Sequence, residues 1–456
     1  MRKTALLLAL ISAPAIASGN KPPDVPAFVP VAATYASGVA PNVVATGTPP
    51  AYAAMPANIA TSPTTGWLVT TDTSYCTFGV PGDGSHGCAV ARVAVEAKMR
   101  TLGMSTHIGF NDPIRNYGQP GTSHLHQFFG NSSTNAYSTY ASLRRRPGSA
   151  MAGGVINATA YWFPCLIKTN PFSDGKNYCV KANNGTVYYE GAQGISAGVG
   201  DEVYMPRGLR FVFGTNMDDP DDLVVKAEIA AANAQPGTSG RYSYKTSGFV
   251  GWTCAGSAYK VALKNTDNSD PWAGACTSSD VMIAEAISPG CWDGSNLWSP
   301  SGYAHMRQTI RDNTLSLDVC PNNWYRVFMV RVKPQFTHSG FADYGSWRLS
   351  SDDMAATNAG HAMRNGESFH TDYLFGWDDT VLRTTEDFCI GANSATGHEC
   401  DSSTLTATTR LITSENAPDG SRIPQVPTVT YGTASAGVMW QVPAATGVAT
   451  TIHTGH

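Results

Sequence analysis

The segment YRVFMVRV, residues Tyr325–Val332, carries the strongest β-strand pattern in the sequence. Aromatic and β-branched residues dominate it and partly alternate with polar ones, which suits a pleated, half-buried surface. Similar runs recur between Gly, Asn, Asp and Pro clusters, namely Gly66–Thr70, Ala158–Phe163, Thr186–Tyr189 and Leu209–Phe213. We therefore predict a mainly β domain, a large jelly-roll-like β-sandwich.

Helical patterns are few. Ala89–Leu102 and Asp221–Ala232 are each expected to form a short helix. The sequence has no repeat with a period of roughly 20–50 residues, which disfavours propellers and solenoids.

Composition excludes several classes of protein. The chain has 456 residues, of which 42% are hydrophobic and 10% aromatic, so it can bury a large core and is not globally disordered. Charged residues are only 14%, against roughly a quarter in an ordinary soluble domain. The formal net charge of −4 gives no basic face, so we expect no nucleic-acid partner.

The start of the chain has the pattern of a secretory signal peptide. Met1–Lys3 carries the positive charge, Ala5–Ile11 is apolar, and Ala15–Ala17 forms a small-x-small cleavage site. We predict a signal peptide over residues 1–17, whose apolar run is too short to span a bilayer. The mature protein is therefore expected to be secreted, or periplasmic in a Gram-negative host, without a membrane span.

The remaining chain divides by composition. Residues 18–65 form a Pro/Ala/Thr-rich leader or linker, residues 66–422 a single β-rich core domain, and residues 423–456 a low-complexity tail. Both flanks are expected outside the core, with part of the leader able to lie along it as an edge strand. We expect a monomer.

The ten cysteines are even in number and lack the CxxC spacing of thiolate metal sites. Their order favours disulfides between neighbours, each closing a short loop and stabilising the fold by roughly 3 kcal/mol. The expected pairs are Cys76–Cys88, Cys165–Cys179, Cys254–Cys276, Cys291–Cys320 and Cys389–Cys400.

An HxH motif marks the first candidate site segment. His124 and His126 follow Asp112 and Arg115 in a turn-rich stretch. On a strand, the two histidines would share one face, while Leu125 points to the core. Paired imidazoles suit metal ligation, proton transfer or substrate hydrogen bonding, and the simpler alternative is two structural histidines.

The second segment, Cys291–Pro300 with the residues just after it, combines flat aromatic rings with polar groups. This mixture suits a sugar site, where ring faces stack and hydroxyls need hydrogen-bond partners. The alternative is a Trp-filled core in which Asp293 makes an Asx-turn. The candidate groups are Trp292, Asp293, Asn296, Trp298, His305 and Arg307.

The third segment runs from His370 to Trp377. His370 and Asp372 are two residues apart, so on a strand they would share one face, as an acid–base or metal–carboxylate pair. The alternative is a buried hydrogen-bonded pair at a strand end.

These three segments together resemble the secreted family catalogued as domain of unknown function 1996, over roughly Thr106 to Trp377. The resemblance rests on Asp112-Pro-Ile, Ser123-His124-Leu-His126-Gln-Phe-Phe-Gly130, Cys291-Trp-Asp-Gly, His305-Met306, His370-Thr-Asp372 and Gly376-Trp377. It implies an exported protein in a polysaccharide or cell-wall setting, and it implies no particular activity.

The leading expectation is action on a polysaccharide, as a glycoside hydrolase or a polysaccharide lyase. A hydrolase would use Asp293 and Asp372 as its carboxylate pair. A lyase would use His or Tyr as the base, with Arg307 or Arg115 offsetting substrate charge. The candidate catalytic residues are His124, His126, Asp293, His305, His370 and Asp372, and the candidate substrate-binding residues are Asp112, Arg115, Trp292, Asn296, Arg307 and Trp377.

Two other functions stay open. In one, His124 and His126, with His305 or His370, bind a divalent metal, zinc or copper. In the other, the protein is a non-catalytic cell-wall carbohydrate-binding module whose histidines are structural. Three ring nitrogens that converge on one point would favour the metal, whereas two carboxylates across a groove would favour hydrolysis.

Overall fold

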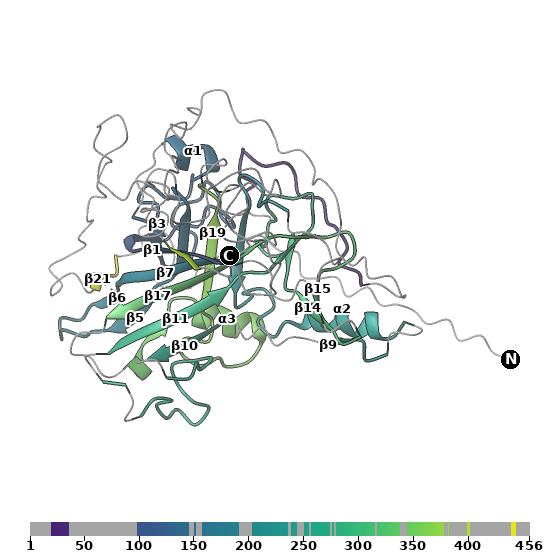
Figure 1. Ribbon diagram of the computed structural model, residues 1–456. Coiled ribbons are helices and arrows are strands. Elements are labelled where there is room, and N and C mark those ends of the chain that lie inside the picture. The colour runs from purple at the N-terminus through teal and green to yellow at the C-terminus, as the bar shows by residue number, and fades with distance from the viewer. Residues whose placement is uncertain are drawn as a thin grey trace, which may run out of the picture.

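A computed structural model of the chain describes residues 20–35, 98–145, 150–151, 157–190, 203–235, 239–243, 250–254, 257–273, 276–277, 280–314, 317–337, 344–377, 382, 399–401 and 439–443. The described chain is mainly β, as predicted, with three short α-helices (Figure 1). These helices are α1 (Tyr140–Arg145), α2 (Leu223–Asn233) and α3 (Asp352–Ala359).

The larger of two main sheets has six strands. In spatial order they are β10 (Val250–Cys254), β11 (Val281–Ile287), β17 (Met329–Thr337), β7 (Ala182–Glu190), β1 (Lys98–Gly103) and β20 (Glu399–Asp401). All neighbours are antiparallel except β1 and β20. The predicted strand Thr186–Tyr189 lies within β7.

The second main sheet has five antiparallel strands and contains the site segments. In spatial order they are β2 (Ser105–Gly109), β3 (His126–Gly130), β4 (Ala160–Pro164), β19 (His370–Leu374) and β8 (Arg210–Gly214). The predicted strands Ala158–Phe163 and Leu209–Phe213 correspond to β4 and β8.

The two main sheets pack face to face, which confirms a sandwich. Phe163 of β4 contacts Phe336 of β17 with ring centroids 6.1 Å apart, and both belong to the largest buried cluster. Gly185 of β7 permits a close approach, because a Cβ there would lie 2.8 Å from the ring of Phe129. Every residue of β3, β4 and β19 is buried, so the other face of the five-stranded sheet is covered as well.

Smaller elements surround this sandwich. Figure 1 shows α2 grouped with β9, β14 and β15 at one side of the molecule. One small sheet contains β9 (Tyr242–Ser243), β14 (Ile310–Asp312) and β15 (Leu317–Val319). A second contains β12 (Cys291–Trp292), β13 (Met306–Arg307) and β16 (Tyr325–Arg326). The third has four strands, β18 (Arg348–Leu349), β5 (Leu166–Thr169), β6 (Asn177–Val180) and β21 (Met439–Gln441). A 3₁₀ turn, η2, spans Tyr344–Ser346.

Two sequence predictions need correction. The run Tyr325–Val332 is not one strand, because it changes sheets: β16 pairs with β12, whereas β17 pairs with β11 and β7. Between them, Val327 donates its N–H to Gly290 O at 3.0 Å outside either ladder.

The prediction of a helix over Ala89–Leu102 is wrong for residues 98–102, the part of this range that the structure describes. From Lys98 onward the backbone forms β1, paired with β7 over its whole length. Non-local pairing thus overrides a local helical pattern. The expected helix at Asp221–Ala232 corresponds to α2. The predicted strand Gly66–Thr70 lies outside the described residues.

Three of the expected disulfides are present, and each joins neighbours in the chain. They are Cys165–Cys179, Cys254–Cys276 and Cys291–Cys320. The expected pairs Cys76–Cys88 and Cys389–Cys400 involve residues outside the described chain. Among the described residues, no helix has the length and apolar character needed to cross a bilayer.

The flanks do not lie wholly outside the core. Residues 20–35 pack along the body without joining a sheet, with Val25 and Tyr35 buried. In the C-terminal flank, β21 pairs with β6. The expectation of two flanks outside the core therefore fails for these segments, while the boundaries of the core domain stay a prediction.

Candidate functional site

The candidate site lies on the face of the five-stranded sheet that points away from the six-stranded sheet. Phe129 and Tyr373 belong to the cluster between the sheets, whereas Phe128 and Leu374 belong to a separate cluster on the other side. Because side chains alternate along a strand, His126 lies on the face of Phe128. His370 and Asp372 likewise lie on the face of Leu374, as the alternation in the sequence predicted.

Strand register brings the distant histidines together. The strands β3 and β19 both pair with β4, one on each side. His126 is opposite Pro164, and Asp372 is opposite Trp162, which puts His370 at the level of Pro164 as well. Two imidazoles about 10 Å apart at the backbone can meet above the intervening strand. His124 precedes β3 rather than lying in it.

The three imidazoles of His124, His126 and His370 form one buried cluster. Ring centroids are 4.1 Å apart for His124 and His126, 5.1 Å for His124 and His370, and 6.2 Å for His126 and His370. One ring nitrogen from each lies within 4.8 Å of the others. None of the three side chains is more than 2% exposed.

Backbone carbonyls fix the orientation of two of these rings. Nδ1 of His126 contacts Asn111 O at 3.0 Å, and Nδ1 of His370 contacts Ser368 O at 2.9 Å. A carbonyl only accepts, so each Nδ1 carries the proton and each Nε2 keeps its lone pair. Nε2 of His126 is buried and has no hydrogen-bond partner among the described residues. Metal-binding histidines have this same arrangement.

Burial favours the neutral form of His126 and His370. Burial lowers the pKa of His370 to about 3, against the opposing effect of its bond to Ser368. Burial holds the pKa of His126 well below its ordinary value, and the repulsion that would arise if His126 and His370 were both protonated lowers it further. Neutral imidazole is the form that binds metals.

Carboxylates and one guanidinium border the cluster. The carboxylate of Asp372 lies 3.9 Å from Nε2 of His370, and its Oδ2 is buried without a hydrogen-bond partner in the described chain. Burial raises the pKa of Asp372 well above its ordinary range, the charge of Asp112 raises it further, and Arg115 opposes this. Arg115 pairs with Asp218 at 2.6 Å.

Asp112 is held in an Asx-turn next to the cluster. Its Oδ1 accepts the N–H groups of Ile114 and Arg115 at 2.8 and 3.0 Å, while its Oδ2 is buried without such a partner among the described residues. Burial raises its pKa, against the effect of those N–H donors. The first and third sequence segments therefore form one site.

The second segment does not join this cluster. Nε2–H of His305 donates to Arg210 O and its Nδ1 accepts from Ser299 Oγ, both at 2.9 Å, so both ring nitrogens are engaged. Asp293 makes the Asx-turn that was the alternative for it, with Oδ1 accepting from Ser295 N and Asn296 N. Catalytic roles for His305 and Asp293 stay predictions.

The predicted substrate-binding tryptophans are buried in the protein. Each indole N–H donates to an oxygen of the same chain: Trp292 to Asn296 O at 2.6 Å, Trp298 to Ile114 O at 2.7 Å and Trp377 to Tyr189 Oη at 3.0 Å. Arg307 donates to the carbonyls of Tyr303, Ala304 and Met306, and lies over the ring of Trp324. Asn296 binds the backbone of Val29.

Sequence reasoning missed Asn111 and Ser368 as residues of the site. Both act through a backbone carbonyl, so the identity of the side chain gives no signal. Only the fold shows that these carbonyls face His126 and His370.

A sequence model of a protein family described as a domain of unknown function (DUF1996) matches residues 112–377. The match begins at Asp112 and ends at Trp377, so it includes every residue of the histidine cluster. No curated protein and no solved structure matches this chain.

Proposed function

Because the chain belongs to the domain of unknown function 1996 family, which has no assigned activity, we propose its function from the site itself. The protein binds a divalent transition-metal ion, Zn²⁺ or Cu²⁺, through His124, His126 and His370. The observation that carries this proposal is the convergence of three buried imidazole nitrogens to within 4.8 Å.

The chemistry of the donors supports such an ion. Imidazole suits zinc and copper, and a carboxylate next to three imidazoles can complete the coordination. Zn–N bonds of about 2.0–2.1 Å require the rings to close inward by up to about 1 Å. The carboxylate of Asp372 lies 3.9 Å from Nε2 of His370, outside the group formed by the three imidazole nitrogens.

The charges near the cluster support a cation of this valence. Within the described part of the chain, the carboxyl groups of Asp112, Asp218 and Asp372 are opposed by the guanidinium of Arg115. A divalent ion neutralises the excess when all three carboxylates are ionised. Burial raises the pKa of Asp372, which favours its protonated form in the metal-free protein, so we expect binding to release protons and to strengthen as pH rises.

Metal analysis of the purified, tag-free mature protein tests the proposal. We expect one Zn²⁺ or Cu²⁺ per chain, lost on dialysis against a chelator and regained on addition of the ion. At a 1,000-fold excess over Kd, the ion should stabilise the fold by about 4 kcal/mol. His126→Ala and His370→Ala should abolish binding, whereas His305→Gln, outside the cluster, should retain it. Absence of bound metal together with unchanged stability on adding either ion contradicts the proposal.

The same proposal includes export from the cytoplasm. Three disulfides join buried or half-buried cysteines, and such bonds persist in oxidising compartments. The N-terminal pattern of a signal peptide agrees with this. Fractionation of the producing cells, with mass spectrometry of the mature N-terminus, tests it.

Action on a polysaccharide stays a prediction. The ring faces of Trp292, Trp298 and Trp377, which motivated it, are covered by the protein in this conformation. A screen for reducing ends and unsaturated products across wall polysaccharides tests it independently of metal binding.

A further inference from the structure

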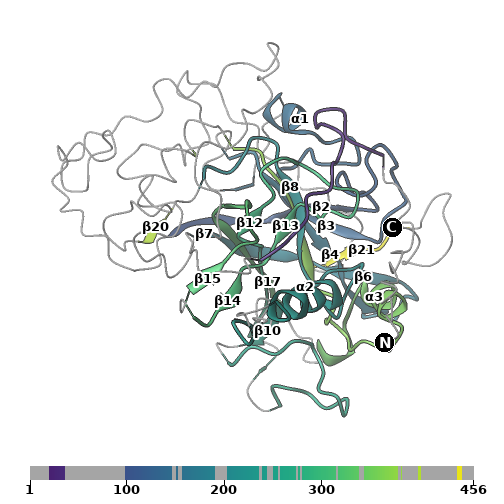
Figure 2. The same ribbon diagram turned by 90° about the vertical axis from the view of Figure 1, so that its right-hand side faces the viewer.

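The N-terminal strap, residues 20–35, ties together three hydrophobic clusters outside the main core. Val25 packs into the cluster that contains Phe128 and Leu374, next to the site. Val31 and Ala33 pack against the Cys291–Cys320 cluster. Tyr35 is part of the cluster beneath α2. Figure 2 shows the strap passing from beside α1 across the body of the protein.

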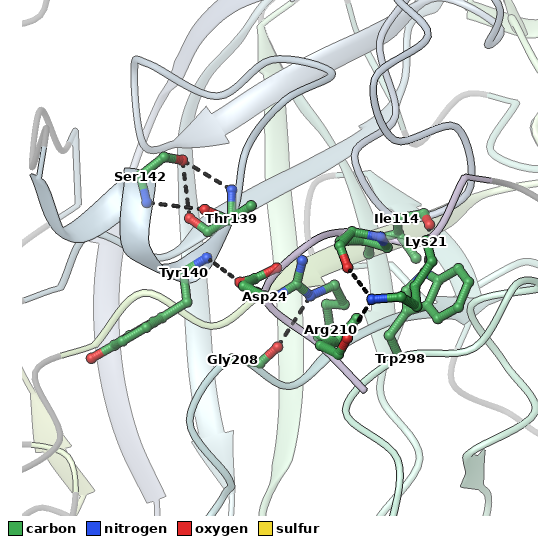
Figure 3. A network of polar contacts seen from close by, with 11 residues as sticks. Lys21, Asp24, Ile114, Thr139, Tyr140, Ser142, Gly208, Arg210 and Trp298 are labelled. Atoms are coloured by element: carbon green, nitrogen blue, oxygen red, sulfur yellow. Dashed lines mark hydrogen bonds and ion pairs between the residues drawn. The ribbon is translucent and has the colours of Figure 1, made fainter. Parts of the chain in front are cut away.

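Asp24 fastens the strap to the sheet that carries the site (Figure 3). Its Oδ2 accepts from Nη2 of Arg210 at 2.6 Å and from the N–H of Tyr140 at 3.0 Å. The side chain of Arg210 is fully buried. Arg210 lies on β8 opposite Leu374 of β19, two residues beyond Asp372.

Further contacts connect the strap, through the loop that holds Asn296 and Trp298, to the turn that borders the site. Val29 donates its N–H to Asn296 Oδ1 at 3.0 Å, and Asn296 Nδ2 donates back to Val29 O at 2.7 Å. Two residues later, Trp298 donates to Ile114 O at 2.7 Å. Ile114 lies in the turn between Asp112 and Arg115. A short series of bonds therefore runs from the strap to the turn that borders the histidines.

The site needs an opening movement if an ion is to enter or leave. The three histidines are at most 2% exposed, so an ion cannot reach them in this conformation. In its described length the strap makes no strand ladder. It is held by side-chain bonds, by small apolar clusters and by a backbone bond from Asn322 N to Thr34 O at 2.7 Å. Segments held in this way open at a lower free energy than paired strands.

We propose that the N-terminal strap is the gate of the metal centre, and that its release from Arg210 and Asn296 controls how fast the ion enters and leaves. This inference rests on the proposed metal function. A gate has a kinetic signature: weakening the strap accelerates both binding and release and leaves Kd nearly unchanged while the closed state predominates. Damage to the ligands would instead raise Kd.

Metal exchange in strap variants tests the gate. Asp24→Asn removes the charge that faces Arg210, and Val25→Ala trims an apolar anchor as a milder second variant. Zn²⁺-loaded protein is challenged with excess chelator, and apo protein is mixed with Zn²⁺, both in stopped flow. We expect each strap variant to accelerate release and binding by about tenfold or more, with Kd within about threefold of wild type.

A matched control is Glu190→Gln, which weakens a buried carboxylate–arginine pair with Arg331 at 2.9 Å on the six-stranded sheet. It should exchange Zn²⁺ at the wild-type rate. Hydrogen exchange at the amide of Val29 measures strap opening without metal and should accelerate in both strap variants.

If the strap variants show faster hydrogen exchange at the Val29 amide but exchange Zn²⁺ at the wild-type rate, the gate is wrong and the metal centre is unaffected. A raised Kd with an unchanged binding rate would overturn it too. A wild-type protein that binds no Zn²⁺ or Cu²⁺ would overturn the metal centre, and the gate with it.

Discussion

Replacing His305 with glutamine is expected to reduce the acid sensitivity of the fold. His305 is fully buried, and its two ring nitrogens bond to Ser299 Oγ and Arg210 O. Burial lowers its pKa to about 3, against the effect of its bond to Arg210. A glutamine can donate to one of these groups and accept from the other, but it does not titrate.

The sign and size of the effect follow from proton linkage. The folded protein keeps His305 neutral, whereas the unfolded chain protonates it below about pH 6.5. The contribution of His305 to the free energy of unfolding is therefore fully present above pH 6.5 and decreases as the pH falls toward 3. When the pH falls from 7 to 5, His305 alone should lower the free energy of unfolding of the wild type by about 2 kcal/mol. The variant should not show this decrease.

Urea unfolding of the metal-free proteins at pH 7 and pH 5, followed by tryptophan fluorescence, measures this difference. Disulfides stay oxidised, and the other histidines are common to both proteins, so their contributions cancel. An equal loss of stability in wild type and His305→Gln would refute the reasoning, as would a His305 signal that titrates near pH 6.5 by NMR.

Three further outcomes are expected. Asp372→Asn should stabilise the metal-free protein at pH 7, because burial disfavours ionisation of Asp372 in the folded protein whereas the unfolded chain ionises it freely. The same change should weaken metal binding, so thermal unfolding and metal titration should move in opposite directions. Removing the Cys291–Cys320 disulfide by a double alanine substitution should cost about 3.5 kcal/mol in urea unfolding, since it closes a loop with a sequence separation of 29. Gly376→Ala should prevent folding, because its Cβ would lie 2.3 Å from Ala158 O; soluble yield and circular dichroism measure this, and a folded variant would contradict it.

Local patterns in the sequence predicted much of the architecture. Aromatic and β-branched runs identified β4 and β8, and the neighbour order of the cysteines gave the three described disulfides. The two-residue spacing of His370 and Asp372 placed both on one face of a strand. These features depend on residues close together in the chain, so the sequence contains them directly.

Local patterns failed where distant pairing determined the outcome. The run Tyr325–Val332 divides because its two halves find partners in different sheets. The helical pattern before Leu102 gives way to a strand beside β7. In the second segment, whose site roles stay predictions, Trp292 donates to Asn296 O and Asp293 accepts from Ser295 N, so both side chains bond within the segment.

The sequence by itself determined that this protein is β-rich and disulfide-bonded, and that histidines and carboxylates stand at strand spacing in two separate segments. Only the tertiary structure decided that His126 and His370, far apart in the chain, meet across β4 while His305 does not join them. The physical reason is that alternation along a strand is a local property of the backbone. Strand order and register instead depend on how the whole chain buries its apolar surface.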